Sequence, residues 1–178
     1  LDVVRPADAN ETSVAWGEIL RRTDRPAGII LSRQDLRIVA RGDEYSSAEG
    51  VARGGYVLKE ASDKPRLILI ASGSEVALAL EAAAKLEEDN VPTRVVSMPC
   101  TEWFDEQDPE YRESVLPKDV KARVSIEAGI AMGWGRYVGD AGASISIECF
   151  GASAAGSKCF EEYGFTVDNV IKTARSVL

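Results

Sequence analysis

Short apolar runs alternate with stretches of helical periodicity after residue 66, and this alternation limits the folds that the chain can adopt. The run Leu67–Ala71 predicts a buried strand, and the pattern after it places four apolar residues on one helical face: Val76, Leu80, Ala83 and Leu86. Further strands are expected at 93–98, 123–126 and 144–148, a short helical segment at 103–116, and a last helix after Thr166. Strands that alternate with helices predict an α/β sheet with helices on its faces.

The first 66 residues follow a different pattern. Asp8 and Glu11 have the spacing of a capping box, which predicts a helix that continues to Arg22. The apolar run 27–31 is too short for a helix and too uniform for a half-exposed strand, so it predicts a buried strand in a parallel sheet. Periodicity is lost over 36–64 apart from a short strand expected at 56–58, and this stretch is predicted to link two units.

The composition excludes several classes of function. The 178 residues contain no histidine, so the chain itself cannot supply a Ser-His-Asp or Cys-His pair or a histidine metal ligand. A net charge of −8 argues against a nucleic-acid partner. The longest stretch without Asp, Glu, Lys or Arg is nine residues, so neither a membrane span nor a signal peptide is expected. Three cysteines without a C-x-x-C spacing favour a reducing compartment, and we expect the cytoplasm.

Arg33 is the first candidate for a ligand contact. It lies in Ser32-Arg33-Gln34-Asp35, directly after the predicted strand that ends at Leu31. Ligands of open parallel sheets bind outside the carboxyl ends of strands, and a guanidinium there suits a phosphate or a carboxylate. The alternative is an arginine that pairs with Asp35 or another local acid.

Four other features have a structural interpretation that we prefer. Ser72-Gly73-Ser74-Glu75 is interpreted as a serine capping box, with anion binding at the helix start as the alternative. Glu127 is expected to serve packing or a subunit interface rather than catalysis, since no partner acid is evident in sequence. The acidic residues between Glu102 and Glu113 are expected to form a solvated face, not a metal site. Cys100 has no basic neighbour and is expected to be an inert thiol.

Ten segments spread over nearly all of the chain match one known family in order and spacing. They are Arg5-Pro6-Ala7-Asp8, Leu31-Ser32-Arg33-Gln34, Ala52-Arg53-Gly54-Gly55-Tyr56-Val57-Leu58, Ile70-Ala71-Ser72-Gly73-Ser74-Glu75-Val76, Val95-Val96-Ser97-Met98-Pro99, Phe104-Asp105 with Tyr111-Arg112-Glu113-Ser114-Val115-Leu116-Pro117, Glu127-Ala128-Gly129, Trp134 with Tyr137-Val138-Gly139, Phe150-Gly151-Ala152-Ser153, and Phe165-Thr166-Val167-Asp168-Asn169-Val170. Taken together, they resemble the C-terminal part of transketolases.

The resemblance implies a fold and a division into domains. Residues 1–42 would finish a pyrimidine-binding domain, 43–66 would be the linker, and 67–178 would form a C-terminal domain with a mixed, mostly parallel sheet and helices on both faces. The domain would take part in a homodimer. Where the family commonly has proline after Phe-Gly-x-Ser-Ala, this chain has Ala155, which leaves the conformation of that loop open.

The resemblance also implies an activity. Transketolases of the pentose phosphate pathway use thiamine diphosphate and a divalent metal, magnesium or calcium, to move a two-carbon ketol unit between ketose and aldose phosphates. Only Arg33 matches a functional residue of the family, as a contact to the sugar phosphate, so the chain is expected to lack its own cofactor, metal and catalytic residues. Because Leu1 opens within ordered sequence, we expect a fragment that is inactive alone. The alternative is a non-catalytic regulatory or oligomerisation module with this fold.

Overall fold

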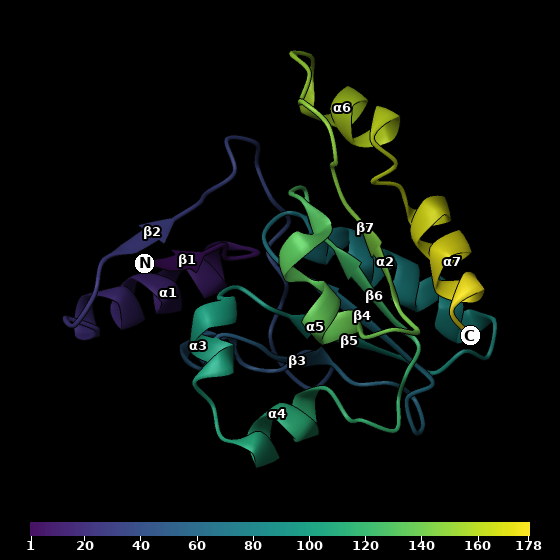
Figure 1. Ribbon diagram of the computed structural model, residues 1–178, viewed down its shortest axis with the longest axis horizontal. Helices are drawn as coiled ribbons and strands as arrows, with labels where there is room; N and C mark the ends of the chain where they lie inside the picture. The colour runs from purple at the N-terminus through teal and green to yellow at the C-terminus, as the bar shows by residue number, and fades with distance from the viewer.

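A computed structural model describes residues 1–178, and its centre is a five-stranded sheet of order β3-β5-β4-β6-β7 (Figure 1). Four neighbouring strands are parallel: β5 (Thr93–Ser97), β4 (Leu67–Ala71), β6 (Arg123–Ile126) and β7 (Ala143–Ile145). The edge strand β3 (Tyr56–Lys59) runs antiparallel to β5. The predicted mixed, mostly parallel α/β sheet is therefore confirmed.

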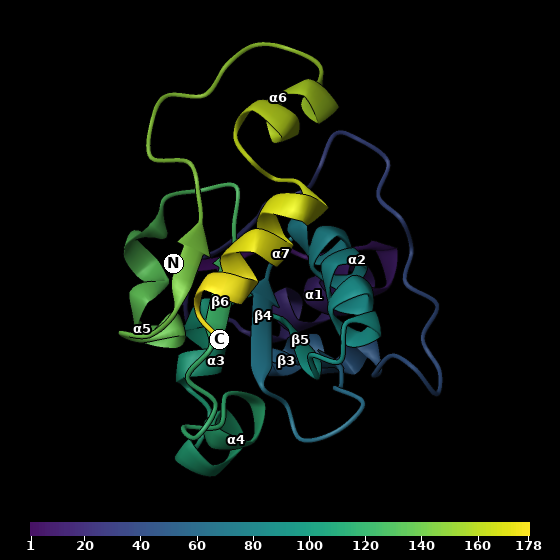
Figure 2. The same ribbon diagram turned by 90° about the vertical axis from the view of Figure 1, so that its right-hand side faces the viewer.

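Helices cover both faces of this sheet, as expected (Figures 1 and 2). On one face α2 (Glu75–Glu88) packs on β4, whose Leu67, Leu69 and Ala71 belong to this core, and α7 (Val167–Ser176) packs on β6, β7 and α2. On the other face, short helices pack near Ile68 and Ile70. These helices are α3 (Thr101–Asp105), α4 (Pro109–Val115) and α5 (Gly135–Val138). Because side chains of a strand point alternately to its two faces, burial on both faces explains why the β4 run is apolar throughout.

Residues 1–31 form a smaller unit beside the sheet. Here β1 (Asp2–Val4) pairs in parallel with β2 (Ala27–Ile29), and α1 (Ala9–Arg21) connects them. Asp8 caps α1 by accepting a hydrogen bond from the Glu11 N–H at 2.9 Å, as predicted. The predicted strand in a parallel sheet is confirmed as β2, but it is shorter than 27–31 and the prediction of burial is wrong, since Ile30 and Leu31 are 50% and 52% exposed. The reason is that β2 lies in a two-stranded sheet with β1 as its only neighbour.

The segment between the two units is structured in part. Residues 43–66, expected to be a linker, contain the 3₁₀ helix η1 (Ala48–Arg53) and the strand β3, which extends the main sheet. Two further elements follow β6, namely η2 (Ala131–Gly133) and α6 (Gly156–Glu162), and neither was predicted. None of the helices has the length and apolar character needed to cross a membrane.

Candidate functional site

Arg33 lies in an exposed loop that follows β2. Every residue from 30 to 35 is exposed, and the Ser32 Oγ stabilises the turn by accepting a hydrogen bond from the Gln34 N–H at 3.1 Å. No ion pair in the structure includes Arg33, so the alternative of a local pair with Asp35 is not supported. Neighbours of Arg33 and the first turns of α1 line an open groove of about 700 Å³. Arg33 itself does not line the groove, but its exposed guanidinium has no acidic partner and is free to meet an anion from solvent.

The loop that carries Arg33 is fixed at its two ends. At its start, the Ile30 N–H donates to the Val4 carbonyl at 2.8 Å. At its end, the Asp8 carboxylate accepts from the Val39 N–H at 2.9 Å, and the Asn10 amide donates to the Val39 carbonyl at 3.1 Å. The backbone of residues 31–38 makes no hydrogen bond to another backbone group. The path of its backbone therefore depends on these two tie points, and the Gln34 side chain also lies against Gly156.

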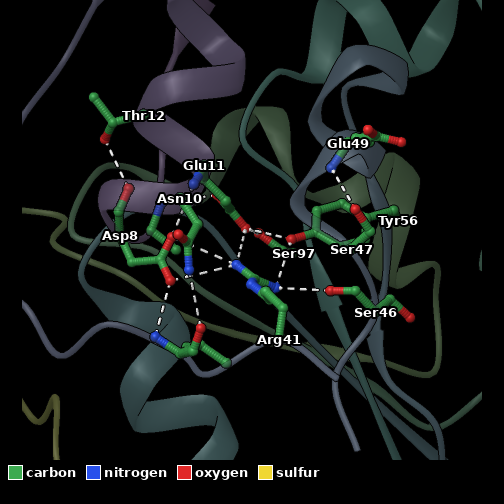
Figure 3. A network of polar contacts seen from close by, with 12 residues as sticks. Asp8, Asn10, Glu11, Thr12, Arg41, Ser46, Ser47, Glu49, Tyr56 and Ser97 are labelled. Atoms are coloured by element: carbon green, nitrogen blue, oxygen red, sulfur yellow. Dashed lines mark hydrogen bonds and ion pairs between the residues drawn. The ribbon is translucent and has the colours of Figure 1, made fainter. Parts of the chain in front are cut away.

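A buried polar network lies beside this loop (Figure 3). Glu11 is fully buried, and its carboxylate accepts three hydrogen bonds: from the Ala7 N–H at 2.8 Å, the Tyr56 hydroxyl at 2.7 Å and the Ser97 hydroxyl at 2.7 Å. Burial raises the pKa of Glu11, and these hydrogen bonds together with the charge of Arg41 oppose that rise. Because Ser97 and Tyr56 belong to β5 and β3, Glu11 joins α1 directly to the main sheet.

Arg41 supplies the positive charge of this network. Its guanidinium lies 3.4 Å from the Asp8 carboxylate and 3.7 Å from that of Glu11, and it donates to the Tyr56 hydroxyl at 3.0 Å. Burial and the nearby Glu11 charge raise the pKa of Tyr56, so the phenol stays protonated and serves as a donor to Glu11. Two buried carboxylates thus share one guanidinium, which compensates part of their desolvation cost.

A second polar cluster lies at the carboxyl ends of β4 and β6. The chain continues from β4 to β5 on one side and places β6 on the other side, so the strand order reverses at this point. Arg5 donates to the Ser72 hydroxyl at 3.0 Å, pairs with Glu75 at 3.0 Å and also pairs with Glu127. The Ser72 hydroxyl donates to the second carboxylate oxygen of Glu127. Burial raises the pKa of Glu127, and Arg5 opposes the rise.

This cluster corrects one prediction and refines another. Ser74 is the N-cap of α2 but makes no capping hydrogen bond; its hydroxyl donates to Glu75 at 2.6 Å, so the predicted serine capping box is wrong. The physical reason is that the fully buried Glu75 is drawn to Arg5. Both carboxylate oxygens of Glu127 are engaged by Arg5 and Ser72, which favours the packing interpretation over catalysis.

Sequence reasoning missed Arg5 as the centre of this cluster. Its partners Ser72 and Glu127 are 67 and 122 residues away in the chain. The rule that ligands and polar groups gather at the carboxyl ends of parallel strands could have grouped Ser72 with Glu127. No comparable signal marks Arg5, because it belongs to the smaller unit.

The remaining candidates take structural roles. Cys100 is buried, and burial raises its pKa to about 12, so the expectation of an inert thiol is confirmed. In the acidic stretch, Glu106 pairs with Arg22 at 2.9 Å and also with Arg25. No group of three His, Cys, Asp or Glu side chains is arranged to hold a metal ion. Arg33 and its groove therefore remain the best candidate site.

The chain was compared with known proteins. Residues 54–166 match the family model described as the transketolase-like C-terminal domain. Transketolase 1 of Escherichia coli is 52% identical over 174 residues, which cover 98% of this chain and 26% of that protein. Transketolase of Mycobacterium leprae is 50% identical over 184 residues, or 100% of this chain and 26% of that one.

Solved structures of similar proteins agree with the sequence comparison. A transketolase from Leishmania mexicana has a TM-score of 0.87 and 40% identity, covering 99% of this chain and 25% of that one. A transketolase from Pichia stipitis in complex with sedoheptulose-7-phosphate has a TM-score of 0.88 and 37% identity over the same shares of the two chains. The present chain thus spans about a quarter of the length of the curated relatives that it matches.

Proposed function

Because this chain belongs to the transketolase C-terminal domain family, we propose that it is the C-terminal part of a thiamine diphosphate-dependent transketolase. The complete enzyme would transfer a two-carbon ketol unit between ketose and aldose phosphates of the pentose phosphate pathway. It would act in the cytoplasm as a homodimer. The identity of about 50% to proteins named transketolase, over the whole of this chain, supports the proposal.

We propose that the cofactor and its metal bind outside the residues of this chain. No acidic or cysteine side chains converge as metal ligands, and the buried carboxylates Glu11 and Glu127 are engaged by hydrogen-bond donors of the chain itself. We therefore assign thiamine diphosphate and a divalent metal, magnesium or calcium, to the rest of the enzyme. In this proposal the rest of the enzyme binds the cofactor and metal, and the present chain contributes the structural scaffold and a contact to the substrate.

The proposed domain division follows the same family. Residues 1–42 would complete the pyrimidine-binding domain, residues 43–66 would be the linker between the two domains, and residues 67–178 would form the C-terminal domain. The separate two-stranded sheet of β1 and β2 supports the first unit, and the five-stranded sheet supports the last. The strand β3 lies within residues 43–66, the proposed linker, but its hydrogen bonds to β5 make it part of the C-terminal sheet.

For Arg33 we propose a contact to the phosphate group of the sugar substrate. The main observation that supports this proposal is that the Arg33 guanidinium is exposed and has no acidic partner. Arg33 also lies beside a groove and just beyond the carboxyl end of β2. A guanidinium can donate two parallel hydrogen bonds to phosphate oxygens, which makes it selective for phosphorylated sugars. The structure of a related transketolase with sedoheptulose-7-phosphate is consistent with a sugar phosphate as the ligand class.

The test is Arg33→Ala in the complete enzyme. Loss of a charge-assisted contact costs about 1.5 to 3 kcal/mol, so the KM for phosphorylated substrates should rise roughly 10- to 150-fold. The KM for unphosphorylated substrates should change little. Arg37→Ala is the matched control, because Arg37 is an exposed arginine of the same segment. An equal rise in KM for both substrate types would remove Arg33 from this role.

The proposal also predicts how the 178 residues behave alone. Purified with thiamine diphosphate, magnesium, a ketose phosphate and an aldose phosphate, they should show no ketol transfer in a coupled assay, because they carry no cofactor site. Turnover at the rate of a complete transketolase would contradict this division of labour.

A further inference from the structure

Between its two tie points the loop that carries Arg33 makes no backbone–backbone hydrogen bond, although the Gln34 side chain lies against Gly156. The tie points therefore decide where the backbone of the loop runs. The apolar side chains at both ends of the loop are largely in solvent, with exposures of 50% for Ile30, 52% for Leu31 and 59% for Ile38. Within this chain they therefore do not anchor the loop by burial. Val39 is the first buried residue after β2, being 6% exposed, and both of its backbone groups are bound by side chains of α1 and its cap.

We propose that Asn10, together with Asp8, is a positioning residue that sets the placement of Arg33 toward the substrate phosphate. The pair forms a clamp, here called the Val39 clamp: the Asp8 carboxylate accepts from the Val39 N–H, and the Asn10 amide donates to the Val39 carbonyl. Figure 3 labels the two clamping side chains, Asp8 and Asn10. This inference rests on the proposed function of Arg33. Neither Asp8 nor Asn10 needs to touch the substrate to act in this way.

The surroundings of the clamp make it rigid. Asp8 is 3% exposed, and its carboxylate is also held by the Glu11 N–H at 2.9 Å and by Arg41 at 3.4 Å. Asp8 thus lies in the same network that ties α1 to β5 through Glu11 and Ser97. Because several hydrogen bonds hold the Asp8 side chain in one position, it can in turn hold the loop in one position. Precise binding geometry usually requires such rigid supporting residues.

Asn10 is the better residue to test, because its substitution removes one contact and little else. Asp8 caps α1 and pairs with Arg41, so replacing it would disturb the helix and the buried charge balance. Asn10 lies in the first turn of α1, and its only side-chain hydrogen bond is the one to Val39. Alanine at this position also has the higher helix propensity. Asn10→Ala should therefore loosen the loop and leave the fold intact.

The experiment measures Asn10→Ala in the complete enzyme, beside Arg33→Ala and the double variant. Asn169→Ala is the matched control, since Asn169 makes the same kind of bond, amide to main-chain carbonyl, on α7 at 2.8 Å from Gly164. Asn10→Ala should raise the KM for phosphorylated substrates about threefold to tenfold, with kcat and the KM for unphosphorylated substrates unchanged. In the Arg33→Ala background the same substitution should add nothing, because the clamp acts through Arg33.

A second measurement reports on the loop directly. Trypsin cleaves after Arg33 and Arg37, both exposed in this segment, and cleavage there should be at least about threefold faster in Asn10→Ala than in Asn169→Ala.

The outcomes separate the two proposals. A selective effect of Arg33→Ala without one of Asn10→Ala would overturn the clamp and leave the function of Arg33 standing. Additive effects in the double variant would likewise overturn it, as would equal cleavage rates in the two asparagine variants. If Arg33→Ala itself shows no selectivity for phosphorylated substrates, the proposed function fails and the clamp fails with it.

Discussion

Replacing Arg5 with methionine should destabilise the chain strongly and in a pH-dependent way. Arg5 is the only guanidinium that pairs with Glu75 and Glu127, whose side chains are 0% and 12% exposed. Methionine has a similar length and no charge, so the variant leaves two buried carboxylates without their cation. Removing one partner of a buried ion pair costs about 3 to 5 kcal/mol, because the remaining charge is left in a poorly solvated place.

The structure points to the lower end of that range. The Arg5 side chain is 18% exposed, so solvent screens part of its interaction, and the Ser72 hydroxyl continues to donate to Glu127. We expect a loss of about 3 kcal/mol at pH 8. With a urea dependence of about 2 kcal/mol per molar, the unfolding midpoint should fall by roughly 1.5 M.

The pH dependence follows from Glu127. Burial raises its pKa in the folded state above the unfolded value, and Arg5 opposes this rise. Without Arg5 the folded-state pKa rises further, so the folded variant takes up a proton more readily than the unfolded chain as the pH falls. The loss of unfolding free energy in Arg5→Met should therefore be largest above the folded-state pKa of Glu127 and should become smaller as the pH falls toward 5.

The assay is urea unfolding followed by tryptophan fluorescence at pH 8 and pH 5. Arg21→Met is the matched control, since Arg21 is 71% exposed and pairs only with Glu18; its loss should cost less than about 1 kcal/mol at either pH. A midpoint shift for Arg5→Met that equals that of Arg21→Met, or one that does not change between pH 8 and pH 5, would refute the reasoning.

Three further predictions concern single residues. Iodoacetamide at pH 7.5 should modify the exposed Cys149 and spare the buried Cys100, whose pKa is raised to about 12; mass spectrometry of the digested protein would show which thiols react. Gly54→Ala should cost more than about 2 kcal/mol in urea unfolding, because Gly54 has a φ of +78° and a Cβ there would lie 2.3 Å from the Cys100 carbonyl oxygen. Thr166→Ala should cost about 1 kcal/mol, since the Thr166 hydroxyl caps α7 through the Asn169 N–H at 3.3 Å, and an unchanged midpoint would contradict that role.

Elements with strong local signals could be predicted from the sequence. The strand β4 is apolar at all five positions and is buried at all five, and the cap residues Asp8 and Thr166 stand where their helices begin. These signals are local, so tertiary contacts need not be known. The three-residue strand β1 is too short to show a period, and its residue Asp2 is buried against Arg25 and Trp103.

The departures from prediction have long-range causes. An apolar run predicted burial of Leu31, but burial depends on what covers a strand and not on the strand alone. Ser72-Gly73-Ser74-Glu75 has the spacing of a capping box, yet Arg5 binds both the Ser72 hydroxyl and the Glu75 carboxylate at the start of α2. Arg33 was found because it follows a strand, whereas the Val39 clamp joins residues that are 29 and 31 positions apart and could not be inferred from spacing.

Three charged residues near the start of the chain explain why the smaller unit takes one orientation on the sheet. Arg5 binds Glu75 and Glu127, Asp8 binds Val39 and Arg41, and Glu11 binds Tyr56 and Ser97. An apolar interface could slide by an ångström at small cost, but each of these buried groups is satisfied in one placement only. A shift of the smaller unit would break several hydrogen bonds at once and leave carboxylates unpaired. The polar contacts therefore fix the geometry of the unit from which the Arg33 loop leaves, and the apolar core supplies most of its stability.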